Sequence, residues 1–291
     1  MTRIRAMSYN VRYDNRNDHH DAWYARRDGI ADLVRFHRPD VVGFQEPLPE
    51  QRADLRERLP EYAMIGSGRR DDDAGEGCPI GVRTDRWEIT DHGTFWLSET
   101  PAEPSIGWDA SHPRVATWVR VVPRTESAAS PSPSSSPSSP SSSTSSTSQS
   151  QDHGRPFVLI NTHLDHQGDR AREAGARLLR RRIPEILAGD EPVVLLGDFN
   201  CTADDAPHRV LTTPDGDRSG PALRDAAATA DVRHGPTTSI TDFSELIAGQ
   251  RIDHVLVSQD VEVKGFATLA DRDERGRYPS DHLPVLAQLD L

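Results

Sequence analysis

Apolar and polar residues along this chain follow two kinds of pattern. Short apolar runs and alternating segments predict strands at residues 3–12, 40–45, 80–82, 94–97, 115–122, 157–162, 192–199, 252–257, 261–269 and 283–289, with another around residue 65. Apolar residues at helical spacing predict helices over 21–36, 50–59 and 169–187. These strands are more numerous than a simple strand–helix alternation would give. The pattern therefore predicts an α/β fold in which two sheets pack together and helices flank them.

A low-complexity segment interrupts the pattern between two of the predicted strands. Residues 127–151 contain only Ser, Pro, Thr, Ala and Gln, and the segment lies between the strands predicted at 115–122 and 157–162. Such a composition cannot bury enough apolar surface to fold, so we expect a disordered insert over about residues 124–155 at the tip of a hairpin. The remaining length is typical of one large α/β domain, and a single domain over 1–291 is expected.

Deleting residues 127–150 is expected to leave the melting temperature nearly unchanged, because a segment without large apolar side chains contributes little buried surface. Calorimetry of the deletion variant beside the full chain measures this. A fall of many degrees would show that the segment packs against the rest of the protein.

The charge balance narrows the partners that we expect. The chain has 34 Lys and Arg against 46 Asp and Glu, a net charge of −12, which argues against tight, sequence-indifferent binding of nucleic acid. A local basic groove would still permit a nuclease. No apolar run approaches the roughly 20 residues of a membrane-spanning helix, and the start alternates like a strand rather than a signal peptide, so a cytoplasmic protein is expected. Cys78 and Cys201 are too few for a disulfide framework and are expected to be reduced.

Polar residues follow or interrupt the apolar runs where strands should end. They are Asn10, Glu46, His163, Asp165, Asp198, Asn200, Asp253, Asp281 and His282. Any one of them could belong to an ordinary turn. Several carboxylates gathered in one cleft are costly unless a cation neutralises them. Oxygen ligands in a chain with few cysteines favour Mg²⁺ or Mn²⁺ over zinc.

The order of these motifs resembles that of the endonuclease/exonuclease/phosphatase superfamily. The motifs are Ser-Tyr-Asn at 8–10, Gly-Phe-Gln-Glu at 43–46, Asn-Thr-His-Leu at 161–164, Gly-Asp-Phe-Asn at 197–200, Arg-Ile-Asp-His at 251–254 and Ser-Asp-His at 280–282. The segments at 93–101 and 107–110 further resemble a bacterial and archaeal subgroup whose substrates are poorly defined. The resemblance implies a DNase I-like α/β/β/α sandwich of two mixed sheets, with a metal-dependent phosphoesterase site at one edge.

The resemblance also implies roles for single residues. Glu46 would be the principal metal ligand with Asn10 beside it, and the metal and phosphate cluster would be completed by Asp198, Asn200 and Asp281. His282, oriented by Asp253, would be the general base, and His163 would hydrogen-bond a phosphoryl oxygen. Glu76 matches the position where nuclease members place a carboxylate partner for that first histidine.

Physical chemistry supports the same arrangement. An anionic phosphoester repels hydroxide, so its hydrolysis benefits from a cation on the phosphate and from a base with a pKa near neutral. Histidine beside an aspartate meets the second need. Whether Asp198 or His282 takes the proton from water stays open, as does the choice between one metal ion and two.

Secondary candidates have two interpretations each. Arg114 follows Trp108, Asp109 and His112, and we expect it to hold phosphate on a substrate-facing loop, with local packing as the alternative. Asp165 with its neighbour His166 either positions a loop or contacts the substrate. The pairs and runs of arginine at 69–70 and 180–182 are expected to be solvated, and His19 with His20 to form an exposed turn.

The leading hypothesis is a Mg²⁺- or Mn²⁺-dependent hydrolase that cleaves phosphomonoesters or phosphodiesters with metal-activated water and without a covalent intermediate. The acidic charge favours a small organophosphate, such as a sugar or lipid headgroup phosphate. An endo- or exonuclease acting on DNA or RNA is the alternative, because specificity lies in loops outside the motifs. A non-catalytic binding module on the same scaffold would have lost a ligand, and none is missing. The oligomeric state is not specified by these patterns.

Overall fold

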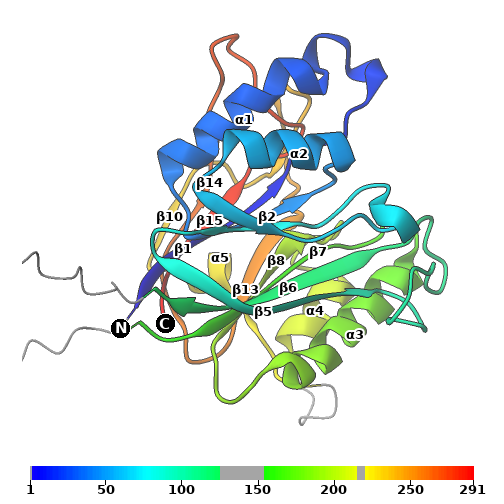
Figure 1. Ribbon diagram of the computed structural model, residues 1–291, viewed down its shortest axis with the longest axis vertical. Helices are drawn as coiled ribbons and strands as arrows, with labels where there is room; N and C mark the ends of the chain where they lie inside the picture. The colour runs from blue at the N-terminus through cyan, green and yellow to red at the C-terminus, as the bar shows by residue number, and fades with distance from the viewer. Residues whose placement is uncertain (1, 125–153, 215–219) are drawn as a thin grey trace, which may run out of the picture.

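Two large mixed sheets pack face to face, and helices cover their outer faces (Figure 1). The structure is a computed structural model that describes residues 2–124, 154–214 and 220–291. The low-complexity insert falls mostly within 125–153, outside the described residues. The predicted four-layer α/β/β/α arrangement is confirmed.

Among the described residues, the first sheet has seven strands, with β1 parallel to β2 and antiparallel to β15. Their spatial order is β10 (Val232–His234), β14 (Glu262–Thr268), β15 (Val285–Asp290), β1 (Arg3–Asn10), β2 (Val41–Gln45), β4 (Ile80–Arg83) and β3 (Tyr62–Ile65). All five residues of β2 are buried. A strand covered on both faces needs a continuous apolar run, and this is why residues 41–44 lack the alternation of a half-exposed strand.

The second sheet, over residues 2–124, 154–214 and 220–291, has six strands, with β7 parallel to β8 and the other pairs antiparallel. Their order is β5 (Trp87–Trp96), β6 (Val115–Pro123), β7 (Phe157–His163), β8 (Val193–Asp198), β13 (Asp253–Val257) and β9 (Arg224–Asp225). The predicted neighbours β6 and β7 do pair antiparallel, with Val121 opposite Phe157. The chain between them therefore connects two adjacent strands.

Helices form the two outer layers. The first sheet is covered by α1 (Trp23–His37) and α2 (Pro49–Arg58), and the second by α3 (Asp169–Ile186) and α4 (Ala206–Thr212) (Figure 1). Shorter elements are η1 (Arg16–Asp21), η2 (Asp71–Asp73), α5 (Ala226–Thr229) and the two-stranded ribbon of β11 (Ile240–Thr241) and β12 (Leu246–Ile247). No helix in the described ranges is both long and apolar enough to cross a membrane.

In the part of the chain that the structure describes, the apolar core has three parts, one between the sheets and one beneath each helical layer. Strand β8 illustrates the division. Val194 and Leu196 lie in the cluster between the sheets, whereas Val193 and Leu195 lie in the cluster beneath α3. Successive side chains of a strand point to opposite faces, so a single apolar run serves both layers.

Two sequence expectations about arginines are wrong. Arg69 and Arg180 are only 6% and 2% exposed. Arg180 donates hydrogen bonds to the carbonyls of Val210, Thr213 and Gly220, which lets a charged side chain lie in a buried position. Arg70 and Arg181 are exposed, as are His19 and His20. Cys78 and Cys201 are free and buried, in agreement with the prediction of reduced thiols.

Candidate active site

The polar residues at the strand ends converge on one edge of the sandwich. In the second sheet, Asp198 lies opposite His163 of β7 on one side and opposite Asp253 of β13 on the other. In the first sheet, β1 ends at Asn10 beside the end of β2. The amide nitrogen of Asn10 donates to Glu46 Oε1 at 3.0 Å and to Asp198 Oδ2 at 2.9 Å. One side chain therefore joins the acidic residues of both sheets.

Asn10 and Glu46 hold each other in place. Glu46 has a left-handed φ of 75°, which is uncommon for residues other than glycine and asparagine, and its Oε2 accepts from the amide of Tyr13 at 2.9 Å. Asn10 Oδ1 accepts from the backbone amide of Arg12 at 2.9 Å. Because that amide can only donate, it fixes which end of the Asn10 side chain faces the carboxylates. Asn10 thus turns its nitrogen toward the acidic pair, and its role as a metal ligand stays a prediction.

Asp198 is the centre of the cluster and is 1% exposed. Its Oδ2 lies 3.3 Å from His163 Nε2 and 3.8 Å from His282 Nε2. Burial raises the pKa of Asp198 to about 7. Candidate ligand atoms of Glu46, His163 and Asp198 all lie within 4.8 Å of one another. This arrangement has the residue types and spacing of a metal site.

The predicted pair of His282 and Asp253 is present. His282 Nδ1 donates to Asp253 Oδ2 at 2.9 Å, and Asp253 is fully buried. Burial by itself lowers the pKa of His282, but the negative charges of Asp253 and Asp198 outweigh that effect and raise it well above the ordinary histidine value. The aspartate therefore both orients the ring and favours its protonated form.

His163 and Asn200 form a neutral pair on the other side of Asp198. Asn200 Nδ2 donates to the carbonyl of Leu164 and to His163 Nε2, both at 2.9 Å. Burial, followed by the charge of Arg114, lowers the pKa of His163 well below its ordinary value. The backbone amide of Asn200 donates to Asp198 Oδ1 at 2.9 Å. These bonds hold His163 as an uncharged imidazole next to the acidic centre.

Asp281 completes the cluster from the segment before β15. Its Oδ2 lies 3.4 Å from Arg12 Nη1. Burial raises the pKa of Asp281; the charge of His282 opposes that rise and the negative charge of Glu46 adds to it. Sequence reasoning did not single out Arg12. The only signal was its place two residues beyond Asn10.

Glu76 has a different partner from the one expected. Its Oε2 lies 2.7 Å from Arg69 Nη1 and 3.9 Å from Arg114 Nη1, and within the described part of the chain no hydrogen bond or ion pair joins it to His163. Glu76 is therefore paired with arginine in this structure, and its role as a partner of the first histidine stays a prediction. A hairpin at 66–79 brings Arg69 beside Glu76 through the bridge between Gly68 and Gly77, and that local pairing satisfies the glutamate.

Asp165 connects two loops. Its carboxylate accepts from Ser111, from Arg114 Nε at 3.2 Å, and from the amides of Gln167 and Gly168. Burial alone would raise the pKa of Asp165, but these donors lower it well below the ordinary value. Asp165 was expected either to position a loop or to contact the substrate, and these hydrogen bonds support the first role. Arg114 is 5% exposed and already engaged, so phosphate binding by Arg114 stays a prediction.

Arg26 is a buried support that no sequence motif indicated. It is fully buried and donates to the carbonyls of Val11, Arg12, Asp21 and Pro279. These bonds tie the segment after Asn10 to the segment before Asp281. Burying a guanidinium is tolerable here because its donors find backbone acceptors.

Replacing Arg26 by alanine is expected to lower the free energy of unfolding by about 3 kcal/mol, because several buried carbonyls lose their donor. Urea titration followed by circular dichroism measures the change. The exposed Arg56→Ala on α2 is the control and should match the wild type. Equal stability of both variants would show that the carbonyls find other partners.

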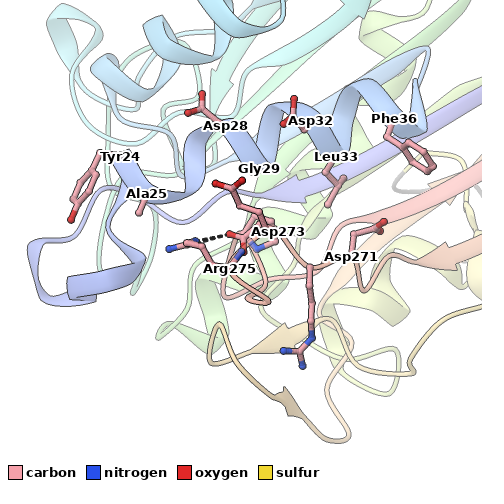
Figure 2. A pocket seen from close by; sticks show the side chains of 13 residues that line it. Tyr24, Ala25, Asp28, Gly29, Asp32, Leu33, Phe36, Asp271, Asp273 and Arg275 are labelled. Carbon is pink, nitrogen blue, oxygen red and sulfur yellow. Dashed lines mark hydrogen bonds and ion pairs between the residues drawn. The ribbon is translucent and has the colours of Figure 1, made fainter.

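A separate cavity of about 720 Å³ lies between α1 and the segment at 271–279. Figure 2 shows Tyr24, Asp28, Asp32 and Phe36 along one side of it and an ion pair of Asp273 with Arg275 on the other. None of its lining residues belongs to the polar cluster described above. A large cavity and the candidate chemistry thus occupy different places.

The cluster and the fold both have counterparts in known proteins. The model of the endonuclease/exonuclease/phosphatase family matches residues 7–282. The structure is similar to that of an endonuclease/exonuclease/phosphatase from Bacteroides vulgatus, with a TM-score of 0.84, 34% identity and coverage of 100% of both chains. It is similar to mannosyl-6-phosphatase Bt3783 of Bacteroides thetaiotaomicron VPI-5482, with a TM-score of 0.83, 32% identity and coverage of 99% of this chain and 100% of the other.

A curated viral protein also matches in part. Uncharacterized protein L388 of Acanthamoeba polyphaga mimivirus is 23% identical over an alignment of 188 residues that covers 61% of this chain and 59% of that protein. The match therefore spans less than two thirds of the viral protein. The family match, in contrast, includes every residue of the polar cluster from Asn10 to His282. This chain belongs to the endonuclease/exonuclease/phosphatase family.

Proposed function

We propose that this chain is a divalent-metal-dependent phosphatase that hydrolyses a small organophosphate with water as the nucleophile. Members of its family act on phosphate esters. The observation that carries the proposal is the contact of Asn10 with both Glu46 and Asp198, next to the hydrogen-bonded pair of His282 and Asp253. The cluster combines anionic oxygens with an oriented imidazole, the two components that phosphoester hydrolysis requires.

The residues present fit Mg²⁺ or Mn²⁺. Carboxylate oxygens are hard ligands that suit both ions, and Glu46, Asp198 and Asp281 are the residues that would hold the metal. Burial raises the pKa of Asp198 to about 7, so this carboxylate lacks full charge compensation from its protein neighbours. A bound divalent cation would supply that compensation and would stabilise the negative charge of the phosphate and of the leaving oxygen.

The imidazole of His282 moves the proton. Its Nδ1 is held by Asp253, and its Nε2 faces Asp198 across 3.8 Å. Nε2 is therefore the atom that exchanges a proton with the attacking water or with the leaving oxygen. Asp198 is the alternative acceptor. His163 and Asn200 are uncharged, so they can lie beside a phosphoryl oxygen without repelling it, and the hydrogen bond expected from His163 to that oxygen stays a prediction.

The substrate class is a phosphorylated small molecule. Similarity at 32% identity to a mannosyl-6-phosphatase, over nearly the whole of both chains, supports a sugar phosphate. The net charge of −12 disfavours a long polyanion. A nuclease would use the same cluster, so DNA belongs in the test.

The test measures phosphate release from mannose 6-phosphate and p-nitrophenyl phosphate, and cleavage of single-stranded and duplex DNA, with Mg²⁺, Mn²⁺ or a chelator. We expect phosphate release from both monoesters with either ion and none with the chelator. DNA cleavage without monoester hydrolysis would favour the nuclease alternative. Full activity in the chelator would contradict metal dependence.

A further inference from the structure

Two histidines beside the acidic cluster have no part in the chemistry proposed above. His166 follows His163 by three residues and is exposed, and His112 is half-buried on the facing loop. Their rings stack with centroids 6.0 Å apart and planes at 20°. The two loops are fastened together through Asp165, which accepts from Ser111 and Arg114 of one loop and belongs to the other. The imidazoles therefore lie on a rigid support.

The hydrogen bonds of His166 identify which ring nitrogen is free. Arg114 Nη2 lies 2.9 Å from His166 Nδ1. A guanidinium can only donate, so Nδ1 accepts and the proton of the neutral ring is on Nε2. Arg114 itself is 5% exposed, which fixes the donor. The N–H group at Nε2 of His166 is therefore available to donate a hydrogen bond to a substrate bound next to the acidic cluster.

The ring of His166 is a neutral donor rather than a cation in this geometry, because its Nδ1 accepts from Arg114. Burial, followed by the charge of Arg114, lowers the pKa of His166, and burial followed by the charge of Arg69 lowers that of His112. His166 lies three residues beyond His163, whose Nε2 is 3.3 Å from Asp198 Oδ2, so the loop that carries His166 begins at the acidic cluster. A substrate with a second phosphate group near His166 would be bound best by cationic side chains there. Neutral N–H donors and stacked ring faces suit hydroxyl groups on a compact ring.

We infer that His166, backed by Arg114 and stacked on His112, is a specificity-determining residue that donates from Nε2 to a hydroxyl group of a sugar phosphate. The inference rests on the proposed function. It names the part of the substrate that distinguishes one phosphomonoester from another. Under the proposed function, the phosphoryl group would be bound at the cluster of Glu46, Asp198 and His282.

The experiment uses the full chain with Mg²⁺ and compares kcat/KM for mannose 6-phosphate with kcat/KM for p-nitrophenyl phosphate, which has no hydroxyl group. His166→Asn keeps an acceptor for Arg114 near the position of Nδ1 but removes the Nε2 donor. We expect the ratio of the two constants to fall about five- to tenfold in both His166→Asn and His166→Ala, mainly through KM for the sugar phosphate. The exposed His234→Ala on β10 is the matched control and should keep the wild-type ratio.

The possible results separate this inference from the proposed function. If the wild type hydrolyses both monoesters but His166→Asn keeps the wild-type ratio, the histidine serves only as a partner of Arg114 and the inference is overturned alone. If the wild type hydrolyses neither monoester, the proposed function fails and the inference fails with it. The inference is supported if the ratio of kcat/KM for the sugar phosphate to kcat/KM for p-nitrophenyl phosphate falls in His166→Asn and stays unchanged in His234→Ala.

Discussion

Replacing Glu46 by glutamine is expected to lower kcat/KM by about a thousandfold while the protein stays folded. Glutamine keeps the shape of the side chain and an oxygen that can accept from Asn10 or Tyr13. It removes the negative charge that would attract a divalent cation to the site. Phosphate release measures the rate, and calorimetric titration with Mn²⁺ measures the loss of cation binding.

The matched control is Glu50→Gln, which removes an exposed carboxylate from the first turn of α2 only four residues away. Its rate and its Mn²⁺ affinity should equal those of the wild type. A Glu46→Gln variant that binds Mn²⁺ and turns over like the wild type would contradict the assignment of Glu46 as a metal-binding residue.

Replacing His282 by alanine is expected to lower kcat by roughly 100- to 10,000-fold, because the group that transfers the proton is lost. Asp253→Asn is expected to be similarly harmful. The asparagine side chain is uncharged, so it no longer supplies the negative charge that orients the His282 ring. In the wild type, that charge lies on Asp253 Oδ2, 2.9 Å from His282 Nδ1. Both variants are assayed for phosphate release at saturating substrate.

The double variant distinguishes a joint role from two separate ones. If Asp253 acts through His282, the combination of His282→Ala and Asp253→Asn should be no slower than His282→Ala alone. If the fall in kcat of the double variant equalled the product of the falls in the two single variants, the two residues would act separately and the pairing would be contradicted. Since Asp253 is fully buried, circular dichroism of each variant is needed to distinguish lost chemistry from lost folding.

The layers of the fold were predictable because central strands of both sheets, such as β2, β7, β8 and β13, are buried on both faces. Such strands need continuous apolar runs, and residues 41–44 and 193–196 have them. Strand β5 was harder. It spans Trp87–Trp96, but only its end at 94–97 was expected, because Glu88, Asp91 and His92 are exposed and interrupt the apolar pattern. A strand at the edge of a sheet that faces solvent has few buried apolar positions, so its hydrophobic pattern is weak.

The candidate site was predictable residue by residue but not in its contacts. Polar groups that end apolar strands stand out in a sequence, and Asn10, Glu46, Asp198, Asp253 and His282 were all identified in this way. Motif order could not show that Glu76 pairs with Arg69 rather than with a histidine. That pairing depends on a hairpin whose bridge joins Gly68 and Gly77.

Composition and order of residues along this chain were sufficient for the layers of the fold, the acidic and imidazole groups, and the family. The direction of the Asn10 amide, the buried position of Arg26 and the free Nε2 of His166 required the folded molecule. Each of these depends on which backbone or side-chain groups the folded chain brings within about 3 Å, such as Asp198 beside the amide nitrogen of Asn10, because a hydrogen bond acts only over that range. Hydrophobic pattern specifies which face of an element is buried, but hydrogen-bond partners are chosen only once the elements have packed.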